Sequence, residues 1–190
     1  MKVGVLALQG AWARHAAMLA RLGASPVAVR TPADLDGVDA LVVPGGESTT
    51  ISMLLESSGL FPVVAERLAA GMPAFGTCAG MILLSREILD GRRDQRCFGA
   101  IDVAVRRNAF GRQVDSFEAD VQVRGVAGGP MHAVFIRAPV ITRVGDGVDV
   151  LAAIDDRPVV CRQESVIAAA FHPELGDDPR LHELFLSEVV

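Results

Sequence analysis

Hydrophobic and polar residues follow two alternating patterns along the first half of the chain. Short apolar runs predict buried strands at 3–8, 26–30, 40–43 and in a run that ends at Phe75. Between these runs, apolar residues recur every three or four positions, which predicts helices at 12–23, 50–57 and 62–71, with a brief helix opened by Thr31-Pro32. Such alternation of strand and helix is typical of a parallel sheet with helices on both faces.

The second half of the chain has a different pattern, in which short apolar runs follow one another with Gly and Asp turns between them. These runs predict strands at 101–105, 116–123, 133–136, 148–154, 159–163 and 166–171. Asp178-Pro179 marks the start of a last helix at 180–190. Because no linker or repeat interrupts the pattern, we expect one domain over residues 1–190. Its fold class is α/β, an open three-layer sandwich whose mostly parallel central sheet carries antiparallel additions in the C-terminal half.

The composition narrows the class of protein. Of the 190 residues, 51% are hydrophobic and 22% charged, which indicates a globular chain. A net charge of −5 without a basic stripe argues against nucleic acid as a partner, and no apolar run reaches the roughly 18 residues that a membrane span needs. The apolar start, residues 1–9, predicts a first strand rather than a signal peptide. Three cysteines without a Cys-x-x-Cys pair predict a reduced, cytoplasmic protein with neither a disulfide framework nor a metal site.

The strongest chemical signal is the stretch Gly76-Thr77-Cys78-Ala79-Gly80, which directly follows an apolar run. Gly-x-Cys-x-Gly between a strand and a helix is the cysteine form of a nucleophile elbow. The glycines permit a turn that is too tight for residues with a Cβ. We therefore expect Cys78 at the tip of a strand and at the start of a helix over 79–88, where the helix dipole stabilises a thiolate.

A second signal, His172-Pro173-Glu174, lies near the other end of the chain. A nucleophilic cysteine needs a base and an orienting group. His172 can take or give the proton, and Glu174 can accept a hydrogen bond from the other ring nitrogen. Residues two apart in an extended chain point the same way, so these two side chains can share one side.

Several loops are expected to meet this pair, because sites in open α/β sheets form at the carboxyl ends of strands. Gln9-Gly10 and the loop 45–48 each follow a predicted strand, as Cys78 does. The backbone N–H groups of Gly46 and Ala79 are the expected donors to the oxyanion of an acyl-transfer reaction.

Each signal also has a purely structural interpretation. A lone cysteine is more often a small buried hydrophobe than a nucleophile, and we assign that structural role to Cys97 and Cys161. The loop 45–48 could be a simple turn, and it lacks the lysine of a phosphate-binding loop. Arg106-Arg107 also fits a solvated pair at a strand end. The remaining histidines are predicted to lie outside the site, with His182 on the exposed face of the last helix; they are His15, His132 and His182.

The glycine-flanked cysteine and the late His-Pro-Glu together resemble a class I, triad-type glutamine amidotransferase, a flavodoxin-like fold. More narrowly, the chain is similar to the glutaminase subunits of pyridoxal 5′-phosphate synthase. The matching segments run through nearly the whole chain, at 3–10, 44–49, 76–80, 107–113, 115–118, 135–139 and 171–175. The family usually has an acidic residue where this chain has Arg14, before His15 in the first helix.

The resemblance implies a glutaminase that needs no cofactor and delivers ammonia to a (β/α)₈-barrel synthase subunit, which builds pyridoxal 5′-phosphate. It implies a triad of Cys78, His172 and Glu174, and places Gln9 and Gly10 near the oxyanion hole and the partner interface. The residues implied in binding L-glutamine are Gly46, Glu47, Ser48, Arg107, Ile136 and Arg137. The alternatives are a glutaminase of another amidotransferase, a DJ-1-like cysteine hydrolase, and a binding subunit with a silent site.

Overall fold

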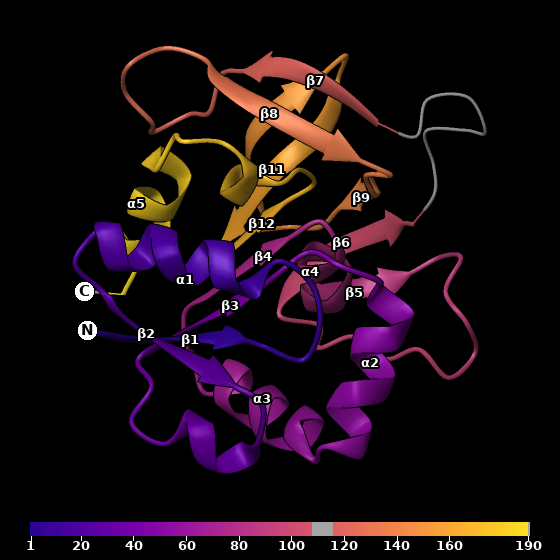
Figure 1. Cartoon of the computed structure of the whole chain (residues 1–190). Helices are drawn as coiled ribbons and strands as arrows, with labels where there is room; N and C mark the ends of the chain where they lie inside the picture. The colour runs from indigo at the N-terminus through magenta and orange to yellow at the C-terminus, as the bar shows by residue number, and fades with distance from the viewer. Residues whose placement is uncertain (108–115, 190) are drawn as a thin grey trace.

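A computed structural model of the chain describes residues 1–107 and 116–189 (Figure 1). Its elements in the first half are β1 Lys2–Leu6, α1 Trp12–Arg21, β2 Ser25–Val29, the 3₁₀ turn η1 Pro32–Leu35, β3 Ala40–Val43, α2 Ser48–Ser57, α3 Leu60–Ala69, β4 Ala74–Thr77, α4 Ala79–Leu84 and β5 Ser85–Ile88. In the second half they are β6 Ile101–Arg106, β7 Ser116–Val121, β8 Met131–Ile136, β9 Val140–Val144, β10 Asp149–Ile154, β11 Arg157–Gln163, β12 Val166–Ala169, the 3₁₀ turn η2 Pro173–Leu175 and α5 Arg180–Ser187.

The central sheet has the strand order β10-β11-β12-β4-β3-β1-β2. From β12 to β2 every neighbouring pair is parallel, whereas β10 and β11 add to the β12 edge in antiparallel fashion. Strands β3, β4 and β12 are buried at every position, as expected for parallel strands covered on both faces. The mostly parallel sheet with antiparallel C-terminal additions is confirmed.

Helices cover both faces of this sheet. Phe75 of β4 packs against His15 of α1 and against His182 and Phe185 of α5, so α1 and α5 lie on one face. The next residue, Gly76, faces Gly80 of α4 on the opposite face. Figure 1 shows α1 and α5 side by side, with α2 and α3 on the other side of the strands. The three layers bring residues from the two ends of the chain together beneath α1.

The second half also contains two smaller sheets. Strands β5, β6 and β9 form one, and the hairpin β7–β8 forms the other. In β8, buried and solvent-facing positions alternate, because one face of the hairpin packs on the body of the protein. No helix among residues 1–107 and 116–189 combines the length and the apolarity needed to cross a membrane.

Two sequence-based assignments near the elbow and the hairpin are wrong. The helix expected over 79–88 ends at Leu84, and Ser85–Ile88 forms β5 instead. The hydroxyl of Ser85 donates a hydrogen bond of 2.7 Å to the carbonyl of Ile82, and the backbone then pairs in parallel with β6. Strand β9 was not predicted. Its apolar residues are interrupted by the adjacent polar pair Thr142 and Arg143, and its pairing with β6 is a long-range contact.

Candidate active site

Neighbouring parallel strands bring the predicted loops to one edge of the sheet. Because β1, β3, β4 and β12 are adjacent and parallel, their carboxyl ends lie side by side. Gln9 follows β1, Gly45 follows β3, Cys78 follows β4 and His172 follows β12. The hydrogen bond from Cys78 N to Ala169 O, 2.8 Å long, extends the pairing of β4 and β12 up to the cysteine.

The elbow at Cys78 is a sharp turn held by two glycines. Cys78 has φ 50° and ψ −105°, a backbone conformation that non-glycine residues rarely adopt. A Cβ on Gly76 would lie 2.7 Å from the backbone of Gly80, and a Cβ on Gly80 would collide with the carbonyl oxygen of Val43. The glycines therefore allow α4 to approach β3 and β4 closely, which presents the Cys78 side chain at the strand tip.

His172 and Glu174 lie in contact, as expected, although the local conformation differs from the extended one assumed. His172 directly precedes the 3₁₀ turn η2, and this turn brings the Glu174 carboxylate beneath the ring. His172 Nδ1 and Glu174 Oε1 are 2.8 Å apart. The backbone N–H of His172 also donates to the carbonyl of Val134 in β8, at 2.9 Å, so the hairpin helps to place the imidazole.

The charges of this pair follow from their surroundings. Burial disfavours the charged form of His172, but hydrogen bonds to Cys78 and Glu174 outweigh it and raise the pKa of the imidazole to about 10. Burial also raises the pKa of Glu174, but its contacts with His15 and His172 reverse this and hold the pKa well below its usual range. Glu174 is therefore ionised and His172 protonated near neutral pH, so an imidazolium faces the Cys78 side chain.

Two glycines after β3, Gly45 and Gly46, lie between His172 and the loop that carries Gln9. A Cβ on Gly45 would lie 2.5 Å from His172 Cε1 and 3.3 Å from Cys78 Cβ, so only glycine fits between these two side chains. Gly46 has φ +156°, and a Cβ there would lie 2.7 Å from Gln9 Oε1. That same oxygen accepts a hydrogen bond of 2.8 Å from the backbone N–H of Glu47. Gln9 thus holds the loop that carries Gly46.

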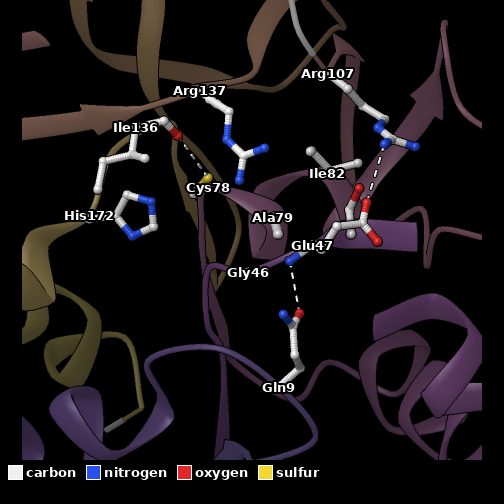
Figure 2. Close-up of a pocket in the computed structure, with 11 residues that line it drawn as sticks. Gln9, Gly46, Glu47, Cys78, Ala79, Ile82, Arg107, Ile136, Arg137 and His172 are labelled. Atoms are coloured by element: carbon white, nitrogen blue, oxygen red, sulfur yellow. Dashed lines mark hydrogen bonds and ion pairs between the residues drawn. The ribbon is translucent and has the colours of Figure 1, made fainter. Parts of the chain in front are cut away.

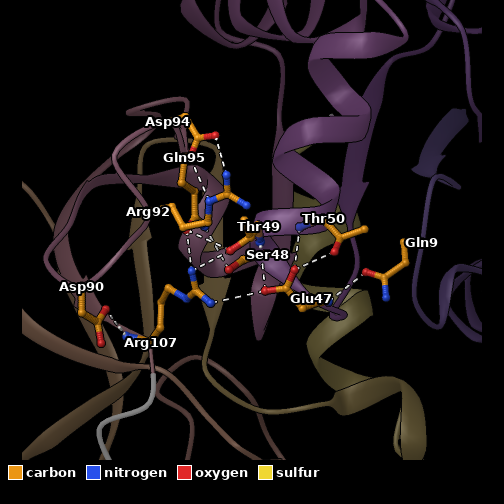
Figure 3. Close-up of polar contacts among 10 residues, drawn as sticks. All are labelled: Gln9, Glu47, Ser48, Thr49, Thr50, Asp90, Arg92, Asp94, Gln95 and Arg107. Carbon is orange, nitrogen blue, oxygen red and sulfur yellow. Dashed lines mark hydrogen bonds and ion pairs between the residues drawn. The ribbon is translucent and has the colours of Figure 1, made fainter.

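Glu47 and Arg107 form the other side of the site (Figure 3). The Glu47 carboxylate caps α2, accepting hydrogen bonds from the backbone N–H groups of Thr49 and Thr50. Arg107 Nη2 lies 3.3 Å from Glu47 Oε1, and Arg107 Nη1 donates to Thr49 Oγ1 at 2.7 Å. This network fixes the guanidinium at the start of α2.

Gln95 completes this network and was not predicted. Its Oε1 accepts a hydrogen bond of 2.6 Å from Arg107 Nη1, and its Nε2 donates one of 3.0 Å to Ser48 Oγ. Gln95 thereby joins two residues that the resemblance places at the substrate. It lies between predicted elements in a stretch without periodicity, so no signal in the sequence marked it.

Between these two sides lies a pocket of about 350 Å³ (Figure 2), within the size range of small-molecule sites. The Arg137 guanidinium points into the pocket, and the carbonyl oxygen of Ile136 lies 3.9 Å from Cys78 Sγ. Arg137 has φ 44°, which turns the chain sharply after β8. The lining residues are Gln9, Gly46, Glu47, Ser48, Cys78, Ala79, Ile82, Arg107, Ile136, Arg137 and His172.

Most of the predicted site residues therefore meet in one cavity. Glu174 lies behind His172 rather than in the wall, and Gly10 packs against the backbone of Gly45. Ile82 lines the pocket and was not predicted; it lies one helical turn after Cys78. Residues 108–113 and Asp115, which carry part of the family resemblance, lie outside the described residues.

The other cysteines do not share the environment of Cys78. Cys161 is fully buried in β11, and burial raises the pKa of its thiol to about 12. Burial also raises the pKa of Cys97. At neutral pH both are thiols, which fits the structural role expected for them.

The prediction that His182 is exposed is wrong, and His15 lies closer to the triad than expected. Both side chains are fully buried, and His15 Nδ1 is 2.9 Å from His182 Nε2. His15 Nε2 lies 3.3 Å from Glu174 Oε2. Helical spacing could have indicated the burial, since His15 is four residues before Leu19 and His182 is three before Phe185. His132 is exposed on the β7–β8 hairpin, paired with Glu118.

Known proteins are similar to this chain in both sequence and fold. Residues 5–190 match the SNO glutamine amidotransferase family. The pyridoxal 5′-phosphate synthase subunit PdxT of Frankia alni is 55% identical over 188 residues, 99% of this chain and 94% of the relative. The subunit of the same name from Mycobacteroides abscessus is 58% identical over 187 residues, 98% of this chain and 96% of the relative.

A solved structure agrees with these relatives. A crystal structure described as a glutamine amidotransferase superposes with a TM-score of 0.92 at 50% identity, and the match covers 98% of each chain.

Proposed function

The chain belongs to the SNO glutamine amidotransferase family, and we propose that it hydrolyses L-glutamine to L-glutamate and ammonia, which it supplies to a pyridoxal 5′-phosphate synthase. The observation that carries this proposal is the arrangement of Cys78, His172 and Glu174 at the carboxyl edge of the sheet, opening on a pocket of suitable size. A nucleophile, a proton carrier and an orienting carboxylate are the parts that amide hydrolysis needs.

The first half of the reaction is acyl transfer to Cys78. The thiolate attacks the side-chain carboxamide carbon of glutamine, and the carbonyl electron pair moves onto oxygen. Backbone N–H groups of Gly46 and Ala79 stabilise this oxyanion in the proposed mechanism. As the C–N bond breaks, His172 gives its proton to the leaving nitrogen, which departs as ammonia and leaves a γ-glutamyl thioester on Cys78.

The second half releases glutamate. His172, now neutral, takes a proton from a water molecule, which attacks the thioester carbon. The tetrahedral intermediate collapses, the C–S bond breaks, and the Cys78 thiolate returns beside a protonated His172. Glu174 keeps its charge throughout and holds His172 through Nδ1, so the ring presents the other nitrogen to the reacting atoms.

Charged side chains that line the pocket suit the α-carboxylate and α-ammonium groups of glutamine. The guanidinium groups of Arg107 and Arg137 suit the α-carboxylate. Glu47 suits the α-ammonium group, with Gly46, Ser48 and Ile136 completing the wall. Glutamine bound in this way directs its carboxamide toward Cys78.

The proposed partner is a (β/α)₈-barrel synthase subunit that consumes the ammonia. Ammonia released into water at neutral pH becomes ammonium and loses its nucleophilicity, so direct transfer within a complex favours the synthesis. Gln9 lines the pocket, and Gly10 packs against the backbone of Gly45 in the adjacent loop; we assign both to the partner interface. A cytoplasmic location belongs to this proposal, because all three cysteines are free thiols.

The test is glutamate release from L-glutamine, measured with and without the cognate synthase subunit. We expect release that rises with the partner and is abolished in Cys78→Ala, while Cys161→Ala, at a buried cysteine that does not line the pocket, retains it. Isolation of a γ-glutamyl thioester on Cys78 would establish the intermediate. Absence of release with the partner bound would refute the proposal and favour another cysteine hydrolase or a silent subunit.

A further inference from the structure

A buried chain of polar side chains continues beyond the triad, into helices α1 and α5. Glu174 Oε1 contacts His172, and its other oxygen, Oε2, faces His15 Nε2 at 3.3 Å. His15 Nε2 is also 3.2 Å from Thr77 Oγ1, and His15 Nδ1 is 2.9 Å from His182 Nε2. The side chains of His15 and Glu174 have 0% exposure, so water does not stabilise them.

The contacts indicate one consistent set of proton positions. A carboxylate oxygen can only accept, so His15 carries its proton on Nε2, facing Glu174. A neutral His15 then accepts at Nδ1, and His182 must donate from Nε2. This leaves His182 Nδ1 as a bare lone pair, in agreement with the absence of a hydrogen bond to that atom among the described residues. In this arrangement His182 donates to His15, and the Nε2–H of His15 faces both Glu174 Oε2 and Thr77 Oγ1.

The need for such a contact follows from the burial of Glu174. A buried carboxylate requires donors at both oxygens, because an unsatisfied charged oxygen away from water is strongly unfavourable. His172 serves only Oε1, and among the described residues no hydrogen bond of ordinary geometry reaches Oε2. The imidazole of His15 is the side chain that faces that atom, with Nε2 at 3.3 Å.

We propose that His15 is a positioning residue, which holds the Glu174 carboxylate ionised and oriented toward His172 and so makes helix α1 part of the catalytic apparatus. The proposal rests on the proposed glutaminase function. His15 does not touch the pocket and acts through Glu174. The contact joins residues near the two ends of the chain, because α1 follows β1, the first strand, and Glu174 follows β12, the last strand.

The consequence for pH dependence follows from the groups that face one another. Glu174 is faced by His172 and His15, His15 by His182 of α5 and Thr77 of β4, and His172 by Cys78. Without a donor from His15, burial disfavours the Glu174 carboxylate, and the protonated form of His172 loses support. A thiolate at Cys78 is stabilised by the imidazolium that faces it, so it loses the same support.

Two polar substitutions separate the contact with Glu174 from the contact with His182. In His15→Gln the amide nitrogen reaches about as far as the histidine Nε2 and can still donate to Glu174. In His15→Asn the shorter amide corresponds to Nδ1 and can reach only His182. Met18→Ala, on the same buried face of α1, is the control for a general loss of packing.

Two measurements apply to each variant. The first is kcat and KM for glutamate release in complex with the synthase subunit. The second is the pH profile of Cys78 alkylation by iodoacetamide, which needs neither glutamine nor the partner. We expect His15→Asn to lose about tenfold or more in kcat with little change in KM, the effect of one hydrogen bond to a charged group. Its alkylation profile should move to higher pH, whereas His15→Gln should stay near the wild type in both.

Equal activity in the Asn and Gln variants, or an alkylation profile that does not move, would overturn the proposal. So would a loss that Met18→Ala shares and that follows the fall in melting temperature. Failure of the proposed function itself looks different: the wild-type complex would then release no glutamate, while alkylation would still report on the state of Cys78.

Discussion

On the triad side of the pocket, the side chains of His15 and Glu174 have 0% exposure and that of His172 has 12%. Across the pocket, Arg107 is 19% exposed and Glu47 is 44% exposed. The triad side takes its residues from strand ends at the centre of the sheet and from the two helices that cover it. The recognition side takes its residues from the start of α2, from the loop around Gln95 and from the end of β6.

This difference in burial indicates how strongly each side of the pocket depends on its individual polar contacts. Buried polar groups interact in a medium of low dielectric and cannot exchange a lost partner for water, so each partner matters strongly. Exposed groups keep water as an alternative partner, and each contact contributes less. We therefore expect substitutions on the triad side to affect the chemical step and those on the recognition side to affect substrate binding.

The largest effect is expected for Glu174→Gln. The amide keeps an acceptor for His172 Nδ1 but then presents its NH₂ group to the donor nitrogen of His15, so one contact must be lost. Replacing the orienting carboxylate of a catalytic histidine by an amide lowers kcat by about 10⁴ in the serine proteases, and we expect a loss of about 10² or more. The measurement is kcat for glutamate release in the synthase complex.

The matched control for Glu174→Gln is Glu118→Gln. Glu118 also contacts a histidine, His132 Nε2 at 3.0 Å, but both side chains are exposed on the β7–β8 hairpin. Its kcat should equal that of the wild type. Similar losses in both variants would contradict the contrast between buried and exposed contacts.

The second effect is steric and is expected for Gly45→Ala. The new Cβ would lie 2.5 Å from His172 Cε1, so the imidazole must move away from Cys78. A displacement of about 1 Å in a catalytic group can lower the rate by ~10², and we expect a fall of that size in kcat. Gly176→Ala is the control, because a Cβ there meets no atom closer than 3.9 Å. A fully active Gly45→Ala would show that His172 tolerates displacement.

The third effect tests the recognition side, through Arg107→Lys. An ammonium group cannot span Thr49, Gln95 and Glu47 as the planar guanidinium does. We expect KM for glutamine to rise about tenfold, the equivalent of one charge-assisted hydrogen bond, with kcat changed far less. Arg162→Lys, which lies between Asp149 and Glu188 away from the pocket, should leave both constants unchanged. A fall in kcat at constant KM would assign Arg107 to the chemical step.

The smallest effect concerns stability rather than activity. Burial lowers the pKa of His182 to about 3, whereas the unfolded chain binds this proton near the usual pKa of 6.5. As the pH falls from 6.5 toward 3, the unfolded state gains a proton that the folded state does not, so this residue makes the protein less stable.

The test is the change in melting temperature between pH 7 and pH 5. Wild type should lose more than His182→Leu over this interval, because the variant lacks the group that titrates. His132→Leu, which removes an exposed histidine, is the control for the replacement of a histidine by leucine. Equal losses in wild type and His182→Leu would show that His182 can be protonated in the folded state.

Most of the fold could be predicted because its signals are local. Alternating strand and helix patterns predicted the parallel half correctly, including β3 at residues 40–43. The errors lie where long-range pairing decides the structure. Ser85–Ile88 leaves the helix to pair with β6, and β9 has a mixed pattern that becomes a strand only beside the same partner.

The site residues also fall into two groups, those marked by a local motif and those whose role depends on distant contacts. The elbow and His-Pro-Glu are short motifs whose chemistry is visible in the residue types, and the strand ends that carry them were expected to meet. Gln95 and His15 were missed because their roles come from partners distant in the chain, Ser48 and Arg107 for one and Glu174 for the other.

The sequence by itself determined the order of most elements, the nucleophile with its histidine and carboxylate, and the resemblance to the amidotransferase family. Each of these depends on residue types at short spacing, which the chain carries whatever its three-dimensional form. The tertiary structure alone decided that α1 and α5 close over the same face of β4, so that His15 and His182 extend the buried polar chain behind Glu174. Periodicity can indicate that a helix face is buried, but the groups it meets depend on packing between segments far apart in the chain.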